Sequence, residues 1–296
     1  MKTGLVLEGG AMRGIYTAGV LDVFMEQGLH FDGVIGVSAG ALHGCSFVSG
    51  QKGRSIRYFK KYRNDKHFMS MWNLVHTGEV VGKQLCYHDI PERLDPYDYE
   101  AFLKSDTEFY ATCSNVETGK AEYIKITDML NQIDVLRASA SMPYVSKLVD
   151  YQGMKLLDGG CTDSIPLEAF RRMGFEKNVV ILTQHKGYVK KPQNAKMAEL
   201  RYHKYPEFAE ALKERHSVYN QSLKEIHRLE EAGEVFVIQP SEKLEISRME
   251  TDLDVIQSVY ERGMMDARVR MKALKEWMEA VSYTHLRAHE TAANLV

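Results

Sequence analysis

The residues best suited to chemistry form a pentapeptide, Gly-Val-Ser-Ala-Gly, at positions 36–40. It follows a short apolar run at residues 31–35 and leads into a segment with helix-forming composition. A serine on a sharp turn between a strand and a helix is exposed as a nucleophile, because flanking glycines allow a turn that a Cβ atom would obstruct. The N-terminus of the following helix favours a developing negative charge. The pattern therefore predicts that Ser38 is a nucleophile, although such a turn can also serve packing alone.

A second glycine-rich segment, Gly-Gly-Ala-Met-Arg-Gly at residues 9–14, follows an apolar run at residues 3–7 and precedes a helical pattern at residues 15–25. Loops of this kind also hold phosphates. Neither G-x-x-x-x-G-K-[ST] nor G-x-G-x-x-G is matched, since Ala11 occupies the place of the second glycine in the latter. The loop can direct several backbone N–H groups at one oxygen, and in an acyl hydrolase that arrangement is the oxyanion hole.

A third cluster supplies a carboxylate. Asp158 ends the apolar run at residues 155–157, and Gly159 and Gly160 follow it. A carboxylate within hydrogen-bond reach can orient a serine hydroxyl and accept its proton. An isolated Asp-Gly-Gly is more often only a turn. Together with the two glycine clusters, however, it makes Asp158 the best candidate for the base.

In this order the three clusters resemble the patatin-like phospholipase family, whose motifs are G-G-G-x-[KR]-G, G-x-S-x-G and D-G-[GA] and which uses a Ser-Asp dyad. The resemblance covers residues 4–175, and residues 137–143 also resemble the family's A-S-x-x-x-P segment. The resemblance implies that Ser38 and Asp158 are catalytic, that the backbone of Gly9, Gly10, Ala11, Met12 and Arg13 forms the oxyanion hole, and that Gly14, Gly36, Gly40, Gly159 and Gly160 support the motifs.

Two positions depart from the family pattern. Ala11 replaces the third glycine of the first motif, and the hole survives if φ at this residue is negative, because alanine keeps its backbone N–H. Ser164 replaces an asparagine that often follows D-G-G, which puts a supporting hydrogen bond in doubt. The side chain of Arg13 is expected to pack or pair so as to hold the loop.

The resemblance implies a serine acyl hydrolase that cleaves carboxylic esters of lipids through an acyl-enzyme, without calcium, another metal or a cofactor. Its partner would be a lipid acyl ester. A thioesterase or acyltransferase with the same dyad and a non-catalytic lipid-binding relative are the alternatives. A Ser-His-Asp triad is disfavoured, because Ser38 follows only about one strand and one helix before its own strand and His43 is expected to point away from it.

Strands and helices alternate along the chain, which predicts an α/β fold of three layers with a mostly parallel central sheet. Further strands are expected at residues 109–114, 121–126, 178–182 and 234–239 and, as a short pair, within 147–158; helices are expected at residues 128–138, 167–173, 206–233 and 252–278. We expect a catalytic domain at residues 1–175 and a C-terminal extension at residues 176–281 that completes and covers the sheet. Residues 282–296 have no apolar period and are interpreted as a non-native or disordered tail.

Composition limits the classes of function. The 296 residues are 44% hydrophobic with a formal net charge of −2, so there is no global basic field for nucleic acid. No apolar run reaches the ~20 residues of a membrane span, and a first strand at residue 3 leaves no room for a signal peptide. The four cysteines are scattered, which indicates free thiols rather than zinc ligands or disulfides. We expect a cytoplasmic protein, with contact at the inner membrane surface left open.

The segment at residues 68–75 is rich in methionine and aromatic residues and allows two interpretations. It is either a packed helix or part of an acyl-chain channel or membrane-facing lip, since methionine and tryptophan suit soft apolar surfaces and interfaces.

Overall fold

The computed structural model of the chain describes residues 1–293, with side chains described for residues 1–280. Residues 294–296, the end of the tail predicted at 282–296, lie outside the described part. That prediction and the division at residue 175 stay predictions.

In the described part of the chain, eight strands form one mixed sheet in the order β5-β6-β3-β2-β1-β7-β8, with β4 paired to β3. Neighbours are parallel from β3 through β2, β1 and β7 to β8, and the pairs β3–β4, β3–β6 and β5–β6 are antiparallel. The prediction of a mostly parallel sheet is confirmed. The strands are β1 (Lys2–Leu7), β2 (Gly33–Val37), β3 (Glu108–Asn115), β4 (Lys120–Ile126), β5 (Val149–Tyr151), β6 (Met154–Asp158), β7 (Phe175–Ile181) and β8 (Val235–Ile238).

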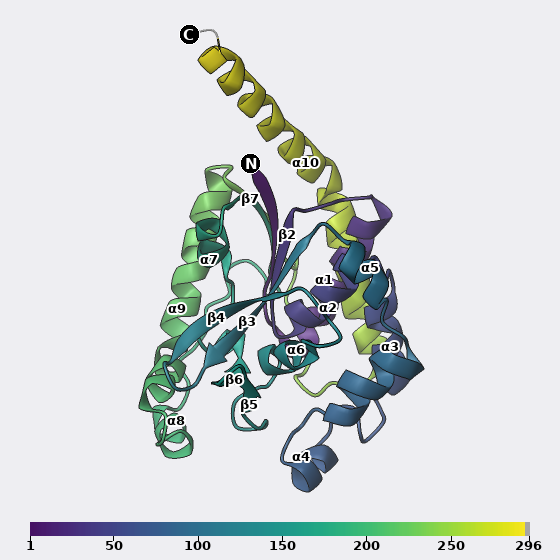
Figure 1. Cartoon of the computed structure of the whole chain (residues 1–296), viewed down its shortest axis with the longest axis vertical. Coiled ribbons are helices and arrows are strands. Elements are labelled where there is room, and N and C mark those ends of the chain that lie inside the picture. The colour runs from purple at the N-terminus through teal and green to yellow at the C-terminus, as the bar shows by residue number, and fades with distance from the viewer. Residues whose placement is uncertain (294–296) are drawn as a thin grey trace.

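Helices cover both faces of this sheet (Figure 1). On one side lie α7 and α9, and on the other lie α1, α2 and α10, with α3 beside them. The α-helices are α1 (Gly14–Glu26), α2 (Ala39–Val48), α3 (Arg54–Tyr62), α4 (Met71–Thr77), α5 (Tyr99–Lys104), α6 (Ile133–Ser139), α7 (Leu167–Arg172), α8 (Ala195–Arg201), α9 (Pro206–Glu231) and α10 (Leu253–Ala293). Three short irregular helices are η1 (Ala11–Arg13), η2 (Leu85–Leu94) and η3 (Gly159–Cys161).

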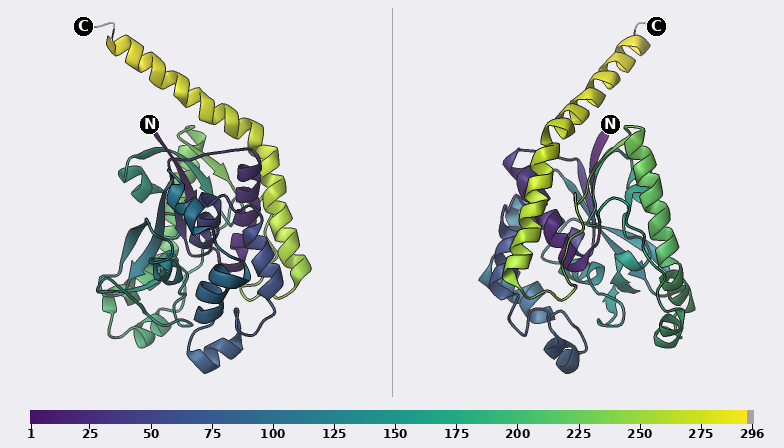
Figure 2. Two further views of the ribbon diagram at one scale, coloured as in Figure 1. Left: turned by 45° about the vertical axis from the view of Figure 1, so that its right-hand side comes forward. Right: turned by 180° about the vertical axis from the view of Figure 1, so that it is seen from behind.

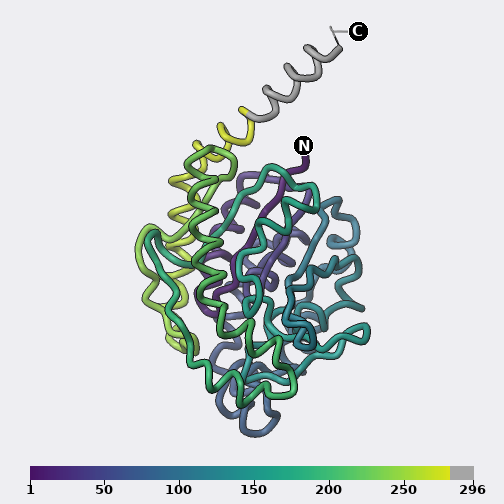
Figure 3. The backbone as a smooth tube through the Cα atoms, turned by 90° about the vertical axis from the view of Figure 1, so that its left-hand side faces the viewer, coloured from purple at the N-terminus to yellow at the C-terminus, as the bar shows by residue number. Residues whose placement is uncertain are grey.

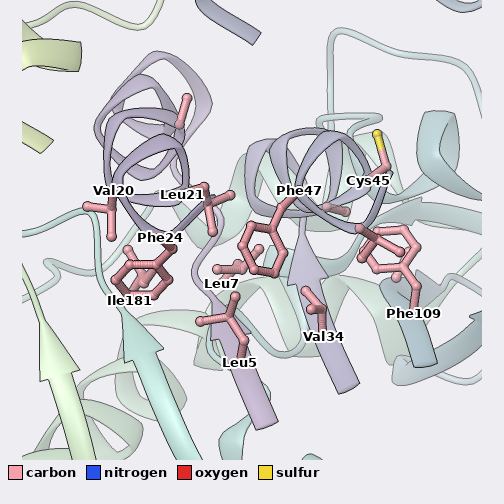
Figure 4. Close-up of a cluster of buried hydrophobic side chains, with 14 of the residues drawn as sticks. Leu5, Leu7, Val20, Leu21, Phe24, Val34, Cys45, Phe47, Phe109 and Ile181 are labelled. Atoms are coloured by element: carbon pink, nitrogen blue, oxygen red, sulfur yellow. The ribbon is translucent and has the colours of Figure 1, made fainter. Parts of the chain in front are cut away.

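The three layers follow from the alternation of side chains along the central strands, where successive residues point to opposite faces of the sheet. Leu5 and Leu7 of β1 lie in the cluster beneath α1 and α2, whereas Val6 between them lies in the cluster beneath α7 and α9. Figure 4 shows Leu5, Leu7 and Val34 rising from the strands toward side chains of the two helices. A strand that is apolar on both faces must be covered on both faces, which sets the sandwich of helices around the sheet.

Two glycines let α10 lie directly against α1. A Cβ atom on Gly19 would come within 2.1 Å of the carbonyl oxygen of Tyr260, and one on Gly263 within 2.1 Å of that of Tyr16. The tyrosine hydroxyls then reach across the interface: that of Tyr16 donates to Asp266 and that of Tyr260 to Asp22. The C-terminal helix therefore fixes α1, whose first residue follows the glycine-rich loop (Figure 2).

Most expected elements are present, with one clear difference. Residues 128–132 were expected to begin a helix, but α6 begins at Ile133. The side-chain oxygen of Gln132 accepts the backbone N–H groups of Thr127 and Asp128 at 2.8 and 3.0 Å. A side chain that satisfies the local backbone in this way stabilises a turn in place of a helix.

The expected pair of short strands within 147–158 is present as β5 and β6, joined by a tight turn at Gln152 and Gly153, both with positive φ. No helix among the described residues is long and apolar enough to cross a membrane.

Candidate active site

Ser38 lies at a strained turn at the carboxyl end of β2. Its φ is +53° and its ψ is −121°, a conformation that L-residues rarely adopt, and α2 begins at the next residue. A Cβ atom at Gly36 would approach the backbone nitrogen of Ala41 to 2.5 Å, and one at Gly40 would approach the carbonyl oxygen of Leu7 to 2.5 Å. Both glycines of the motif are therefore required by close backbone contacts.

A buried serine on the neighbouring helix holds this turn. The backbone N–H of Ser38 donates to Ser139 Oγ at 2.9 Å, and Ser139 Oγ donates to the carbonyl of Thr112 at 2.7 Å. Ser139 is fully buried at the end of α6. It thereby ties the turn to strand β3, a link that lies within the predicted A-S-x-x-x-P segment.

Asp158 lies at the carboxyl end of β6, where β6 pairs with β3. Its Oδ1 accepts the backbone N–H of Gly160 at 2.7 Å, and the Ser38 side chain lies near enough to influence the carboxylate. Burial raises the pKa of Asp158 above its usual value, while the Ser38 side chain, the charge of Arg215 and the Gly160 N–H act in the opposite direction. The fold thus joins the two residues that the sequence put 120 positions apart.

The glycine-rich loop departs from expectation at Ala11. Its φ is +48°, so the negative φ on which the expected role of its N–H depended is not present. The turn into η1 demands this left-handed conformation, which costs an L-residue roughly 1 kcal/mol and which glycine adopts freely. A Cβ atom at the preceding Gly10 would approach Thr183 Oγ1 to 2.6 Å, so that position cannot carry a larger residue without rearrangement.

Two of the five amides predicted to form an oxyanion hole are already bonded. The N–H of Gly9 donates to the carbonyl of Ser164 at 3.3 Å, and that of Arg13 donates to the carbonyl of Gly10 at 3.1 Å. The amides of Gly10, Ala11 and Met12 have no such partner among the described backbone hydrogen bonds. The amides at the start of a helix have no intrahelical partner either. The candidate donors therefore narrow to these three residues.

Ser164, at the position where the family often has an asparagine, makes two hydrogen bonds beside the site. Its Oγ donates to the carbonyl of Gly160 at 3.0 Å, and its own carbonyl accepts the N–H of Gly9. The residue therefore connects the Asp-Gly-Gly turn to the glycine-rich loop.

Sequence reasoning missed a buried carboxylate beneath the loop. Glu8 is 1% exposed and accepts the N–H of Thr183 at 2.5 Å and the hydroxyl of Tyr219 at 2.7 Å. The available signal was an acidic residue between an apolar strand and a glycine loop. Arg13 was expected to pack or pair, and its Nε is buried without a hydrogen-bond partner.

An apolar cavity of about 120 Å³ opens beside Ser38. Its wall joins Met12 and Ser38 to apolar side chains of α2, α3, η2 and α6, among them Leu42, Phe59, Ile90 and Leu136. Phe68 and Met69 also line it. The following helix, α4, buries Asn73 but leaves Met71 62% and Val75 77% exposed, so the segment is helical and packs on one side only.

The Ser38 side chain acts on the carboxylate of Asp158, whose pKa it lowers. His43, on the same helix as the turn, is buried, and burial lowers its pKa to about 4. Within residues 1–280, no group of three or more His, Cys, Asp or Glu side chains is placed to hold a metal ion.

The profile of the patatin-like phospholipase family matches residues 5–171, more than half of the chain. The chain belongs to the patatin-like phospholipase family. Residues 205–279 match a second profile, described as a domain of unknown function (DUF6363). The family match spans all three motifs and contains both Ser38 and Asp158.

Curated relatives share the N-terminal part of the chain. The uncharacterized protein YjjU of Escherichia coli K12 is 31% identical over 185 residues, covering 62% of this chain and 52% of YjjU. Lysophospholipase NTE1 of Cryptococcus neoformans is 27% identical over 192 residues, covering 61% of this chain and 11% of that protein. The NTE1 of Saccharomyces cerevisiae is 28% identical over 188 residues, covering 58% and 10%. The chain thus spans about half of the first relative and about a tenth of the others.

Among solved structures, VipD of Legionella pneumophila aligns with a TM-score of 0.44 at 13% identity, covering 92% of this chain and 67% of VipD.

The Ser139 link predicts a measurable loss of stability. Ser139→Ala leaves the N–H of Ser38 and the carbonyl of Thr112 buried without this partner, which costs about 1–3 kcal/mol. Urea unfolding of Ser139→Ala should show this loss, whereas Ser258→Ala, which removes an exposed hydroxyl on α10, should change the free energy of unfolding by less than about 0.5 kcal/mol. Equal stability of the two variants would contradict the role given to Ser139.

Proposed function

We propose that the protein is a serine acyl hydrolase that cleaves carboxylic esters of lipids with Ser38 as nucleophile and Asp158 as general base. The observation that carries the proposal is that the Ser38 side chain lies near enough to the buried Asp158 carboxylate to lower its pKa, beside an apolar cavity. A hydroxyl is a weak nucleophile until a base within hydrogen-bond reach takes its proton. Because Ser38 is held on a strained turn, its side chain has a fixed direction relative to that base.

In the first half of the reaction, Ser38 Oγ attacks the ester carbonyl carbon while its proton passes to Asp158. The tetrahedral intermediate collapses as the bond to the alcohol oxygen breaks, and Asp158 returns the proton to that oxygen. In the second half, Asp158 takes a proton from water, which attacks the acyl-enzyme. The fatty acid leaves as Ser38 regains a proton. No metal or cofactor is needed for either half.

The amides of Gly10, Ala11 and Met12 are proposed to stabilise the oxyanion. They belong to a loop whose shape is set before substrate arrives, by the Gly9–Ser164 and Arg13–Gly10 hydrogen bonds. Donors that are held in place cost no reorganisation during the reaction, and one such donor contributes about 10²–10³-fold in rate.

The apolar cavity is proposed to hold the acyl chain of the substrate. Its walls are almost free of charge apart from Arg54, whose guanidinium donates to the carbonyl of Asp95. The lysophospholipase names of several relatives agree with an ester of this class. A thioesterase or acyltransferase would use the same dyad, but no feature of the cavity favours either.

We propose that the protein meets lipid at the membrane surface through α4 and α8. Phe68 and Met69, just before α4, line the cavity beside Ser38. Both helices lie at the lower end of the molecule in Figures 1 and 3. They expose Met71 and Val75 on α4 and Leu200 on α8. Exposed apolar side chains beside a lipid site suit a shallow and reversible contact with a bilayer. A cytoplasmic location with peripheral binding is part of this proposal.

Replacing the base tests the proposed reaction directly. Asp158→Asn keeps the size of the side chain but removes the proton acceptor, so kcat for a p-nitrophenyl acyl ester should fall by about 10²–10⁴-fold. Asp150→Asn, on the exposed edge of β5, is the matched control and should keep its kcat. A folded Asp158→Asn variant with near-normal turnover would overturn the dyad.

The raised pKa of Asp158 predicts where activity is lost in acid. The base works only as the carboxylate, so kcat/KM should fall as pH decreases through its pKa, at a pH above the 3.8 of an ordinary aspartate. The profile of kcat/KM between about pH 3 and 8 should show this limb while circular dichroism reports an unchanged fold. A flat profile down to the usual pKa of aspartate would contradict the assignment.

The membrane proposal predicts a difference between two exposed valines. Val75→Glu puts a charge on α4, whereas Val269→Glu changes a residue of similar exposure on α10. Flotation with liposomes of phosphatidylcholine and phosphatidylglycerol should show several-fold weaker binding of Val75→Glu only. Equal binding of both variants and the wild type would exclude α4 from the contact.

A further inference from the structure

Helix α9 contacts two parts of the proposed site through its buried face. Leu212 lies in the apolar cluster that also holds Leu157 and Cys161, the residues on either side of the Asp-Gly-Gly turn. Two turns further along α9, Tyr219 lies in the cluster that holds Val6 of β1. The helix therefore passes from the turn that carries the proposed base to the strand that leads into the glycine-rich loop.

Arg215 of α9 holds the turn of the proposed base. Its Nε donates to the carbonyl of Gly160, and the N–H of Gly160 donates to Asp158 Oδ1 at 2.7 Å. Ser164 Oγ donates to the same carbonyl at 3.0 Å. A Cβ atom on Gly160 would lie 3.0 Å from Asp158 Oδ1 and 3.4 Å from Arg215 Nη2, so the carboxylate and the guanidinium border the same small space. The position of Asp158 therefore depends on α9.

Tyr219 lies one turn after Arg215 on the same face of α9. Its hydroxyl donates to Glu8 Oε1 at 2.7 Å, while the N–H of Thr183 donates to Glu8 Oε2. Glu8 is buried and directly precedes Gly9, the first residue of the glycine-rich loop. A buried carboxylate needs donors for its oxygens, and α9 supplies one of them. The start of the loop is therefore fixed by α9 as well.

Asn220, next to Tyr219, ties the loop after β7 to the same part of α9. The N–H of Lys190 donates to the Asn220 side chain at 2.8 Å, and the Lys190 carbonyl accepts from this side chain at 3.0 Å. The ring of Tyr188, on the same loop, lies edge-on to that of Tyr219 with 6.0 Å between the centroids. Tyr219 is therefore held from the side of the loop, which fixes the direction of its hydroxyl.

Arg215 also carries the charge that acts on Asp158. Burial raises the pKa of this carboxyl group, and the guanidinium lowers it. Asp158 in turn acts on Cys113 of β3 and Cys161 of η3, but both are buried thiols whose pKa values burial raises, so they are neutral. Among the residues with described side chains, Arg215 is thus the charged group that opposes the cost of burying the carboxylate.

We propose that the region at residues 205–279 completes the proposed active site, with Arg215 positioning the base and Tyr219 positioning the glycine-rich loop. The inference rests on the proposed function and gives a role to the part of the chain that matches a domain of unknown function. Neither residue lines the apolar cavity; Arg215 acts through Gly160, and Tyr219 through Glu8. Such contacts matter to turnover, because a misplacement of about 1 Å can cost about 10²-fold in rate.

Two substitutions at Arg215 in the intact protein test the first part. Arg215→Gln should lower kcat for a p-nitrophenyl acyl ester by about tenfold or more with little change in KM. It should also move the acid limb of kcat/KM to higher pH, because the charge that favours the carboxylate is lost. Arg215→Lys keeps the charge but not the fork of donors, so its acid limb should stay close to that of the wild type. Arg228→Gln, which changes an exposed arginine on the same helix, should keep both kcat and the limb.

Urea unfolding separates positioning from a purely structural role. If Arg215→Gln is less stable but its folded form keeps the kcat and the acid limb of the wild type, the role given to Arg215 is overturned.

The second part is tested by Tyr219→Phe, which removes only the hydroxyl that binds Glu8. Oxyanion donors act in the transition state, so kcat should fall while KM stays unchanged. We expect a loss of about tenfold, smaller than the 10²–10³-fold that follows outright removal of one donor. A folded Tyr219→Phe variant with the kcat of the wild type would overturn the role given to Tyr219.

An inactive wild type would refute the proposed function without deciding the role of α9. The contact with the base is then measured by a carbon NMR titration of the Asp158 carboxyl group, whose signal is identified by its absence in Asp158→Asn. A midpoint that moves to higher pH in Arg215→Gln but not in Arg228→Gln supports the proposal independently of hydrolysis. Equal midpoints in the wild type and both variants overturn it.

Discussion

The parallel pairing of β1 with β2, in which Leu7 lies opposite Gly36, is the constraint on which the site depends. Parallel neighbours end at the same edge of the sheet, so the loop after β1 and the turn after β2 must meet there. They meet so closely that a Cβ atom at Gly40 would lie 2.5 Å from the carbonyl oxygen of Leu7. The candidate oxyanion donors and the candidate nucleophile are therefore neighbours because of strand order, not because of contacts between their side chains.

The carboxylate of Asp158 lies at the same edge of the sheet because of a different strand pairing. Strand β6 runs antiparallel to β3, and Asp158 lies opposite Cys113. A buried carboxylate is unfavourable without donors, and here Gly160 supplies one beside the Ser38 side chain. The raised pKa of Asp158 is the remaining cost of burial, and it is also what makes the group a better proton acceptor. The same burial thus accounts for the electrostatics of the site and for its proposed chemistry.

The C-terminal half of the chain does more than cover the sheet with helices, because it also contacts the site. α10 holds α1 through the glycine contacts at Gly19 and Gly263. α9 brings Tyr219 to Glu8 beneath the loop and Arg215 to the Asp-Gly-Gly turn. The family match at residues 5–171 ends before these residues. The described fold is therefore one sheet whose site draws on both halves, with β7 of the C-terminal half paired directly to β1.

Local signals explain what could be predicted. Glycine and serine in a short motif indicate a sharp turn of the backbone. The turn at Ser38 and the role of Gly36 and Gly40 could therefore be predicted from the sequence. Apolar alternation predicted the central strands. The positive φ of Ala11 could not be predicted, because the loop, and not the residue type, sets that angle. The contact of Arg215 with the Asp-Gly-Gly turn had no local signal in the sequence, because it arises only when the fold brings distant segments together.

The central claim is that Ser38 is an activated nucleophile and that Asp158 activates it. The most direct measurement treats the purified protein with a fluorophosphonate probe and locates the adduct by mass spectrometry. We predict a single modified residue, Ser38, with a labelling rate that falls by about 10²-fold or more in Asp158→Asn. Labelling at another serine, or an equal rate in a folded Asp158→Asn variant, would contradict the account.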